Sequence, residues 1–257
     1  MADKKVPVLE TKKLGITFGG LKAVQDFNIQ IFEGELVGLI GPNGAGKTTV
    51  FNMLTGVYLP TEGSVILNGK VLNGMKPHQV VASGVARTFQ NIRLFRQMSV
   101  IDNVKSAFTK DISYNMIDAT FRTPKFWKAE KELTEKALDL LSIFHLEEKA
   151  DYISANLPYG QQRKLEIARA LATNMKLLLL DEPAAGMNPT ETAELLECIN
   201  VIRKRFGIAI LLIEHDMSLV MNVCERIQVI DYGMTIAKGL PEEIAKDPKV
   251  IAAYLGE

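Results

Sequence analysis

Residues 41–48 read Gly-Pro-Asn-Gly-Ala-Gly-Lys-Thr, which is a complete G-x-x-x-x-G-K-[ST] phosphate-binding loop. The loop follows the apolar run 36–40 and leads into a helical stretch at 49–54, which is the strand–loop–helix setting that the motif requires. The glycines let backbone N–H groups turn towards a phosphate, and the following helix adds the positive end of its dipole. A chance glycine-rich turn would not predict this setting. The segment therefore indicates a nucleoside triphosphate bound with magnesium.

Each part of the loop has an expected task. Lys47 can reach the β- and γ-phosphates, and the Thr48 hydroxyl can coordinate Mg²⁺. The residues expected to contact the nucleotide are Gly41, Pro42, Asn43, Gly44, Ala45, Gly46, Lys47, Thr48 and Thr49. Kinases, GTPases and transport ATPases share such a loop, so other segments must decide between these classes.

A second apolar strand, at 177–180, ends in two carboxylates, Asp181 and Glu182. Next to the phosphate loop, Asp181 would hold Mg²⁺, usually through water. Glu182 would then act as a general base, or orient the water that attacks the γ-phosphate in line. The alternative is a strand that ends in two solvated acids. The phosphate loop upstream makes that alternative the weaker one.

Composition places the chain among ordinary globular proteins. Its 257 residues suit one large α/β domain or two small ones, and 47% of them are hydrophobic. Lysine plus arginine equals aspartate plus glutamate, at 30 each, so no basic field indicates nucleic acid. No apolar run approaches the roughly 20 residues of a membrane-spanning helix, and the first residues lack the apolar core of a signal peptide. Cys198 and Cys224 fit a reducing cytoplasm, without metal-ligand spacing.

The elements around the phosphate loop read as strands and turns. Residues 27–31 alternate like a half-buried strand, and 64–67 are expected to form a short strand before an Asn68-Gly69 hairpin turn. The run 208–213 is a further buried strand, typical of a parallel sheet covered on both faces. These signals predict an α/β core.

Helical signals dominate the middle and the end of the chain. We expect a helical insert at about 97–165, with an amphipathic helix at 128–144 and a mobile loop between Phe108 and Trp127. Asn188-Pro189-Thr190-Glu191 has the residues of a capping box and opens another helix. The predicted buried stripe of that helix is Leu195, Leu196, Ile199 and Ile202. Residues 241–257 look like two short helices that pack through Val250, Ile251, Tyr254 and Leu255.

The segment Leu157-Pro158-Tyr159-Gly160-Gln161-Gln162-Arg163 precedes a strong helical run. With this segment the chain resembles the ATP-binding subunits of ABC transporters, which carry Leu-Ser-Gly-Gly-Gln here. The resemblance implies a head-to-tail dimer in which Tyr159, Gly160 and Gln161 contact, in trans, the γ-phosphate held by the other subunit. Pro158 replaces the serine and Tyr159 the first glycine, so the hydroxyl contact is lost and proline removes a backbone donor.

The same resemblance assigns three more residues. Gln90, in the segment 85–90, would sense Mg²⁺ and the attacking water, and His215 would hydrogen-bond the γ-phosphate. Phe18 would stack on the adenine ring. Asn188 stands where the family has an aspartate. The implied catalytic set is Glu182, His215, Gln90 and Lys47, and the implied metal set is Thr48, Gln90 and Asp181.

The resemblance covers about residues 8–257. It implies an α/β P-loop NTPase (ABC ATPase) core with an N-terminal antiparallel β subdomain and a helical insert. The expected organisation is a single ATP-binding domain. Its core lies at about 8–96 and 166–240, its helical subdomain at about 97–165, and its helical tail at 241–257.

Six segments narrow the resemblance to the first ATP-binding subunit of bacterial branched-chain amino acid importers: 87–90, 93–96, 157–163, 181–189, 213–217 and 253–257. The implied activity is ATP hydrolysis coupled to transport. The implied partners are a second ATP-binding subunit (the same chain or a related one), integral membrane permease subunits and, indirectly, a secreted solute-binding protein, with no nucleic acid. The implied place is the cytoplasmic face of the cell membrane.

Other functions stay open at this point. The chain could drive another ABC transporter, for urea, amides or lipopolysaccharide, or it could be a soluble ABC-type ATPase that acts on DNA or ribosomes. A small-molecule P-loop kinase is a third reading. Glu182 and the segment 157–163 argue against that kinase reading, and the single module with zero formal net charge argues against nucleic acid.

Overall fold

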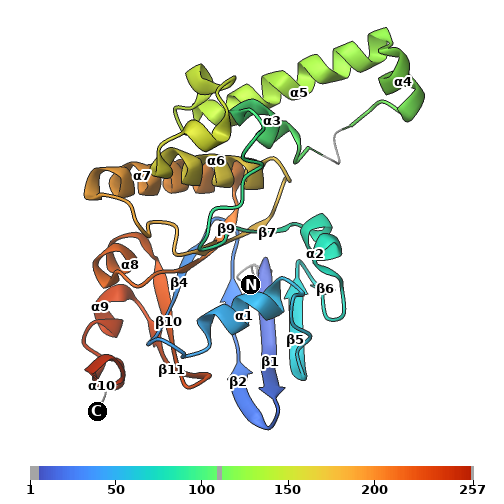
Figure 1. Ribbon diagram of the computed structural model, residues 1–257. Helices are drawn as coiled ribbons and strands as arrows, with labels where there is room; N and C mark the ends of the chain where they lie inside the picture. Colours follow the sequence, from blue (N-terminus) through green and yellow to red (C-terminus); the bar gives the residue numbers. More distant parts are fainter. Residues whose placement is uncertain (1–5, 109–111, 256–257) are drawn as a thin grey trace, which may run out of the picture. The chain divides into compact units, whose positions relative to one another are not determined.

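The computed structural model describes residues 6–108 and 112–255. It divides into two compact units, which we treat separately (Figure 1). The core unit comprises Met1–Gln90, Lys176–Ala185 and Ile202–Glu257, and the helical unit comprises Asn91–Met175 and Gly186–Val201. The domain boundaries expected near 97 and 165 stay a prediction.

A six-stranded sheet forms the centre of the core unit, in the order β11-β10-β4-β9-β8-β7. Its strands are β4 (Leu36–Ile40), β7 (Val85–Arg87), β8 (Leu177–Asp181), β9 (Ala209–Ile213), β10 (Arg226–Asp231) and β11 (Met234–Gly239). All pairings are parallel except that of β10 with β11. Every residue of β4, β8 and β9 is buried, which confirms the predicted buried strands. Parallel strands end at one edge, so the segments after β4, β8 and β9 meet there.

A smaller antiparallel sheet, in the order β2-β1-β5-β6, completes the strands of the core unit, and β3 pairs with β1. Its strands are β1 (Leu9–Phe18), β2 (Leu21–Phe27), β3 (Gln30–Ile31), β5 (Glu62–Leu67) and β6 (Lys70–Val71). The strand predicted at 27–31 is wrong, because the chain breaks at Asn28, whose side chain bonds the backbone of Lys13 and Asp26. The hairpin turn at Asn68-Gly69 is confirmed, and both residues have positive φ.

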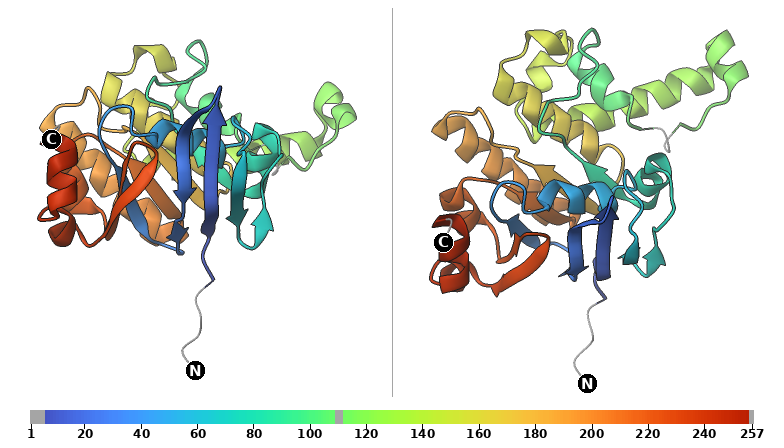
Figure 2. Two further views of the ribbon diagram at one scale, coloured as in Figure 1. Left: turned by 90° about the horizontal axis from the view of Figure 1, so that it is seen from below. Right: turned by 60° about the horizontal axis from the view of Figure 1, so that its bottom comes forward.

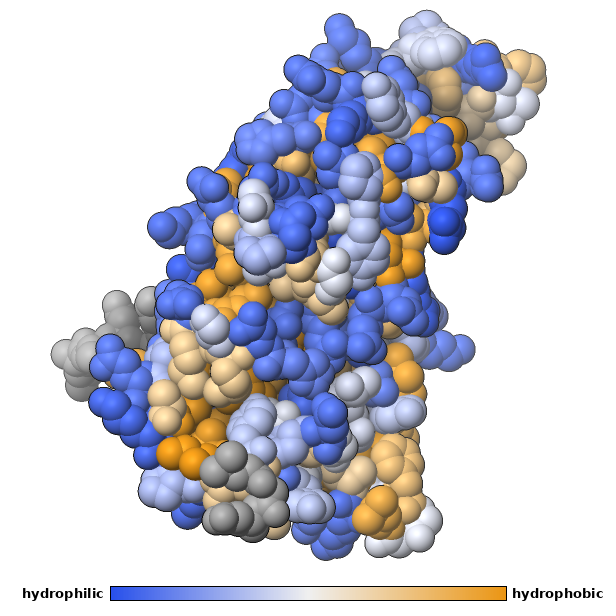
Figure 3. Space-filling model, turned by 60° about the vertical axis from the view of Figure 1, so that its left-hand side comes forward, coloured by the Kyte–Doolittle hydropathy of each residue, from blue (hydrophilic) through white to orange (hydrophobic). Residues whose placement is uncertain are grey.

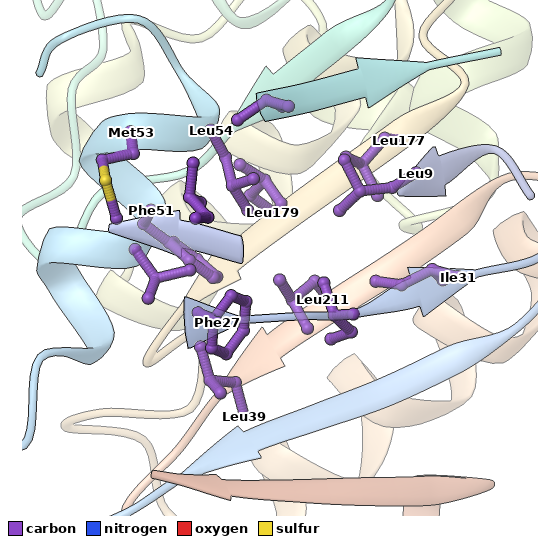
Figure 4. Packing of buried hydrophobic residues seen from close by; sticks show 14 of the residues in the cluster. Leu9, Phe27, Ile31, Leu39, Phe51, Met53, Leu54, Leu177, Leu179 and Leu211 are labelled. Atoms are coloured by element: carbon purple, nitrogen blue, oxygen red, sulfur yellow. The ribbon is translucent and has the colours of Figure 1, made fainter. Parts of the chain in front are cut away.

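The core of this unit lies between the two sheets and α1 (Lys47–Leu54), as Figure 4 shows. Phe51 and Leu54 of α1 pack in one cluster with Phe27 of β2, Leu179 of β8 and Leu211 of β9. Burial of one such side chain stabilises the fold by about 1.5–3 kcal/mol. The helix that follows the phosphate loop is therefore held in place by its apolar side.

Four further helices belong to the core unit: α2 (Pro77–Ser83), α8 (Met217–Val223), α9 (Pro241–Ile244) and α10 (Pro248–Leu255). The last two confirm the predicted pair of short helices. The predicted packing face is only partly right, because Val250 is buried whereas Ile251 and Tyr254 are 45% and 42% exposed. Ala252 and Ala253 of α10 line a cavity together with the phosphate loop. The side chain of Leu255, the fourth residue of the predicted face, lies outside the described residues.

The helical unit contains α3 (Val100–Lys105), α4 (Met116–Phe121), α5 (Pro124–Ser142), α6 (Tyr159–Leu171) and most of α7 (Pro189–Phe206). Short 3-10 turns lie at Glu147–Lys149 and Ser154–Asn156. Amphipathic α5 confirms the helix predicted from residue 128, with Leu133, Ala137 and Leu141 buried.

The loop predicted between Phe108 and Trp127 is wrong for the described part of that segment. Asn115 caps α4 and Thr123 caps α5, so two helices form where we expected none. Residues 109–111 lie outside the described residues. Figures 1 and 2 show α4 and the start of α5 extending past the other helices of this unit.

The capping box that opens α7 is confirmed. The Glu191 N–H donates to Asn188 Oδ1 at 2.9 Å, and the Asn188 N–H donates to Glu191 Oε2 at 3.1 Å. Of the predicted stripe, Leu195, Ile199 and Ile202 are buried, and Leu196 is half-buried. Local sequence signals were sufficient here because the cap involves only neighbouring residues.

The face drawn in Figure 3 is mostly hydrophilic, with separate apolar patches between the polar side chains. Within residues 6–108 and 112–255, no helix combines the length and the apolar character needed to cross a membrane.

Candidate nucleotide site

The phosphate loop connects β4 to α1, and two of its glycines, Gly41 and Gly46, lie too close to neighbouring backbone for any side chain. Gly41 has a φ of 154°, and a Cβ there would lie 2.0 Å from the carbonyl oxygen of Ile230 in β10. Gly46 has a φ of 104°, and a Cβ there would lie 2.9 Å from the carbonyl oxygen of Ala23. The loop is therefore pressed against neighbouring strands at both ends, and only glycine fits.

The first turn of α1 offers backbone donors to an anion. Gly46 is the N-cap residue and makes no side-chain cap, and α1 begins at Lys47. The N–H groups of Lys47, Thr48 and Thr49 belong to the turn that has no partner within its own helix. These N–H groups and the helix dipole favour a phosphate at this point.

Lys47 is folded over its own loop. Its ammonium group donates to the carbonyl oxygens of Gly41 at 2.6 Å and Pro42 at 2.9 Å. Burial lowers the pKa of Lys47, and the nearby charges of Glu182 and Asp181 raise it. A phosphate placed in the loop would take over the hydrogen bonds that the two carbonyls now accept.

Asp181, at the end of β8, forms a buried ion pair that sequence reasoning missed. Arg87 Nη2 donates to Asp181 Oδ2 at 2.6 Å, and both side chains are less than one-tenth exposed, at 7% and 8%. Arg87 also donates to Asn52 Oδ1 of α1 at 2.7 Å. The guanidinium thus ties β7, β8 and α1 together. The available sequence signal for this ion pair was the position of Arg87, three residues before Gln90. In the structure, Arg87 lies on β7, which pairs with β8.

Glu182 is the residue on which two other predicted site residues, Gln90 and His215, converge. Its Oε2 accepts a hydrogen bond from Gln90 Nε2 at 2.9 Å, and its Oε1 lies 2.5 Å from His215 Nε2. Its backbone has a φ of 48°, unusual for a residue with a side chain, and its N–H donates to the carbonyl oxygen of Ile213 in β9 at 2.9 Å. The turn after β8 therefore aims this carboxylate at the segment after β9.

Glu214 supports this arrangement and was also missed. It is 5% exposed, and its carboxylate accepts hydrogen bonds from the N–H of Ala184 at 2.9 Å and the N–H of His215 at 3.3 Å. Burial raises the pKa of Glu214. The side chain joins the turn after β8 to the turn after β9. An isolated Glu beside His215 gave no sequence signal for that bridging position.

Phe18 lies at the end of β1, 44% exposed, with its ring edge-to-face against Tyr58 at 5.3 Å between centroids. An exposed aromatic side chain held by a second ring suits stacking on a flat base. Tyr58 was not predicted, because it follows α1 in a turn and has no sequence signature.

Residues 159–161, expected to act in trans, lie at the N-terminal end of α6 in the helical unit. Pro158 is the N-cap residue and makes no side-chain cap. Tyr159 is 45% exposed, and Gln161 Oε1 accepts a hydrogen bond from Lys149 at 2.8 Å. A Cβ on Gly160 would lie 2.9 Å from the Glu191 carboxylate, so a larger residue there would displace the Glu191 side chain. Their contact with a second chain stays a prediction.

The oxygen donors around the loop fit magnesium shared with a nucleotide. Thr48 presents an exposed side chain in the first turn of α1, and Asp181 supplies a carboxylate. Among the described residues, no group of three His, Cys, Asp or Glu side chains could hold a metal ion by itself. Mg²⁺ is commonly held by one or two protein oxygens together with phosphates and water, which suits this sparse set.

Comparison with known proteins supports the assignment of residues 41–48 as a nucleotide-binding loop. A family model described as ABC transporter matches residues 24–185, and a second, described as branched-chain amino acid ATP-binding cassette transporter, matches residues 234–257. BraF of Pseudomonas aeruginosa, a high-affinity branched-chain amino acid transport ATP-binding protein, is 47% identical over 251 residues, which cover 98% of both chains. LivG of Escherichia coli, described in the same words, has the same identity and coverage.

Solved structures agree in fold. The crystal structure of the ADP conformation of an ATP-binding cassette of an ABC transporter has a TM-score of 0.84 and 31% identity, and the match covers 98% of this chain and 100% of that one. This likeness confirms the predicted α/β P-loop core with an antiparallel sheet and helices. By the family model over residues 24–185 and the relatives that match it end to end, the chain belongs to the ABC transporter family of ATP-binding proteins.

Proposed function

We propose that this chain is the ATP-hydrolysing subunit of a membrane importer for branched-chain amino acids. The observation that supports hydrolysis best is the convergence of Gln90 and His215 on the two carboxylate oxygens of Glu182. A carboxylate held by two polar side chains next to a phosphate loop is suited to activate water.

In the proposed reaction, the loop N–H groups and Lys47 bind the β- and γ-phosphates and neutralise charge that develops during transfer. Magnesium, when bound through Thr48 and Asp181, would supply further charge neutralisation on the phosphates. Glu182 accepts a proton from the attacking water, and Gln90 and His215 orient that water and the γ-phosphate. Phe18 stacks on adenine.

We infer that two ATP-binding subunits close head-to-tail on two ATP molecules. The segment 159–161 of each would cover the γ-phosphate bound by the other. The N–H groups of the first turn of α6 and its helix dipole supply the binding, because Pro158 has no hydroxyl to contribute. The second subunit is a copy of this chain or a related one.

The cargo and the partners are supported by the relatives. BraF and LivG are named as branched-chain amino acid transport proteins, and a model of that description matches the C-terminal residues 234–257. The proposed partners are two permease subunits and, indirectly, a secreted solute-binding protein. They would hold the chain at the cytoplasmic face of the cell membrane.

The test is reconstitution of the full chain with its genomic-neighbour permeases, second ATPase and binding protein in lipid vesicles. We expect ATP-dependent uptake of leucine, isoleucine and valine, and no uptake with the Glu182→Gln chain. Uptake of urea or amides alone would support ATP-driven transport by this chain but would contradict the proposed amino acid cargo. Transfer of phosphate to an added acceptor, in place of free phosphate, would overturn the hydrolase itself.

A second cargo class has one observation in its favour. The lipopolysaccharide export protein LptB of Haemophilus influenzae is 32% identical over 252 residues, against 47% for BraF. Because its identity is lower and the C-terminal model describes a branched-chain amino acid transporter, we favour the amino acid importer.

A further inference from the structure

The end of the helical unit formed by α4 and the start of α5 exposes large apolar side chains. Met116 is 84% exposed, Ile117 67%, Phe121 76% and Trp127 57%. Helix α4 has no buried residue at all, so its apolar side chains do not serve the core of this unit. We call residues 112–128 the apolar tip; Figures 1 and 2 show it beyond the other helices of the unit.

Side-chain hydrogen bonds fix the backbone of the apolar tip. Asn115 and Asp118 form a reciprocal capping box at the start of α4, and Thr123 Oγ1 donates to Asp118 Oδ1 at 2.9 Å. Tyr114 donates to Glu130 Oε1 of α5 at 2.9 Å. Since these bonds already fix the backbone, docking on another surface would cost the tip little further ordering.

Three aromatic side chains pack against one another within the tip. The rings of Tyr114 and Phe126 lie 5.0 Å apart between centroids, and those of Phe126 and Trp127 lie 5.4 Å apart, each pair edge-to-face. Tyrosine and tryptophan carry an apolar body and a polar end, which suits the boundary between lipid and water.

The charge that the tip leaves unpaired is positive. Asp118 and Glu130 are compensated by Lys125 at 3.8 Å and Lys105 at 2.7 Å. The exposed side chains of Arg122 and Lys128 form no ion pair with any described residue. The sequence as a whole has zero formal net charge, so the tip is more basic than the chain average. It favours an anionic partner.

A cavity of about 560 Å³ lies at the same place, lined by Arg122, Phe126, Trp127 and Thr134 and by two ion pairs, Lys105–Glu130 and Lys131–Glu135. It puts a cation beside aromatic walls. This combination suits an anionic headgroup whose neighbouring chains cover Ile117 and Phe121. Apolar residues with basic neighbours are typical of segments that lie in a membrane interface.

We propose that the apolar tip is a lipid-binding surface, which inserts Met116, Ile117, Phe121 and Trp127 into the interface of an anionic membrane. Arg122 and Lys128 contact the phosphates of the headgroups. This goes beyond the proposed motor function and does not depend on the cargo. A contact of this size is weak alone, and it gains strength when the permease holds the chain near the same membrane.

Trp127 provides the test, because it is the single tryptophan of the chain. Full-length protein is titrated with vesicles of phosphatidylcholine, with and without phosphatidylglycerol. We expect a blue shift of tryptophan emission with the anionic vesicles and quenching by brominated acyl chains. Added salt should weaken the binding, because exposed charges are screened.

Two variants separate the apolar and the ionic parts of the contact. Ile117→Ser with Phe121→Ser should lower vesicle affinity by roughly tenfold or more, because two exposed apolar side chains are lost. Arg122→Gln with Lys128→Gln should remove roughly tenfold of the preference for anionic vesicles. The matched control is Val71→Ser with Val81→Ser, two valines of the core unit that are 51% and 42% exposed. Circular dichroism and ATP binding verify that all variants fold.

The proposal fails if the emission of Trp127 is the same with and without anionic vesicles, or if the control pair loses as much affinity as the tip variants. It also fails if the tip variants bind vesicles normally but lose assembly with the permease in detergent. That result would assign the tip to a protein contact.

Discussion

His215 Nε2 lies 2.5 Å from Glu182 Oε1, while the other oxygen of the same carboxylate accepts a hydrogen bond from Gln90 at 2.9 Å. Both oxygens are therefore engaged by side chains from two different segments, one after β7 and one after β9. If nucleotide binds as proposed, the γ-phosphate and its attacking water compete for the same two side chains. In the proposed mechanism, that competition connects nucleotide binding to the position of Glu182.

Glu182→Gln should stop hydrolysis and keep ATP binding. The amide has the shape of the carboxylate but cannot accept the proton of the water, so we expect turnover to fall by about 10²–10⁴-fold. ATP affinity should change little, because Lys47 and the loop donors remain. The measurements are phosphate release and nucleotide binding, with sizing chromatography under saturating ATP.

The variant should also accumulate as an ATP-bound dimer, because without hydrolysis the closed dimer keeps its ATP and does not reopen. Glu132→Gln, an exposed glutamate of α5, is the matched control and should leave all three readouts unchanged. A monomer at saturating ATP would count against the head-to-tail dimer. Normal turnover would remove Glu182 from the proposed role.

Gln90→Ala and His215→Ala should each reduce turnover by roughly 10²-fold and change ATP affinity much less. In the proposed mechanism both residues work together with Glu182 on the same attacking water, so their effects should not add. In a Glu182→Gln background, either substitution should cost almost nothing more. This double-mutant cycle is measured from steady-state turnover. Independent, additive losses would show that the two side chains do not work through Glu182.

The sequence was sufficient for the parts of the site that local spacing defines. The phosphate loop and the two carboxylates that follow β8 could be read directly, since each motif is contiguous. Gln90 and His215 needed the family resemblance, because a single glutamine or histidine carries no local signature. Their convergence on Glu182 depends on the strand order.

Arg87 and Glu214 escaped prediction for a related reason. Each bridges segments that are distant in sequence, and the register of β7 with β8, or of β8 with β9, decides their partners. The break of the strand at Asn28 and the helix at 116–121 were missed because side-chain caps overrode the local pattern. Where the capping residues and the apolar stripe both indicated a helix, as after Asn188, the predicted helix was confirmed.

Arg87→Ala should destabilise the core unit. Removal of the guanidinium leaves the Asp181 carboxylate buried without its partner, at a cost of about 3 kcal/mol in the free energy of unfolding. Arg87→Lys keeps the charge but loses the second contact to Asn52, so about 1 kcal/mol is expected. Urea unfolding without nucleotide measures both.

The exposed Lys204→Ala should change stability by less than about 0.5 kcal/mol and is the control. If Arg87→Ala costs no more than this control, the ion pair contributes nothing net. That outcome would assign Arg87 to the nucleotide site alone.

Glu214 should make stability depend on pH. Burial raises its pKa above the ordinary value of 4.5, so the folded chain binds the proton more tightly than the unfolded chain does. The stability that this group contributes is fully present below pH 4.5 and is lost as pH rises through the folded-state pKa. Glu214→Gln should therefore become relatively more stable, compared with the unsubstituted chain, as pH increases across that window.

Urea unfolding at a series of pH values measures this difference, and Glu132→Gln controls for the loss of a carboxylate elsewhere. The comparison uses differences between chains, so other titrating groups cancel. A difference in the free energy of unfolding that does not vary with pH would show that Glu214 titrates alike in the folded and unfolded chains.

Pro158→Ser should be tolerated and would restore the residue that the family carries there. A serine at this N-cap can accept a hydrogen bond from the first turn of α6, which stabilises a helix by about 1 kcal/mol. Loss of the proline ring restores freedom to the unfolded chain and offsets about 0.4–1 kcal/mol of that gain. Stability should change little, and turnover should stay the same or rise, because the hydroxyl adds a phosphate contact. Pro158→Ala removes the ring without adding the hydroxyl, so a rise in turnover confined to the serine variant would locate the effect in the hydroxyl. Loss of turnover in both variants would instead mean that α6 needs the proline ring to present Tyr159 and Gly160 to the partner's nucleotide.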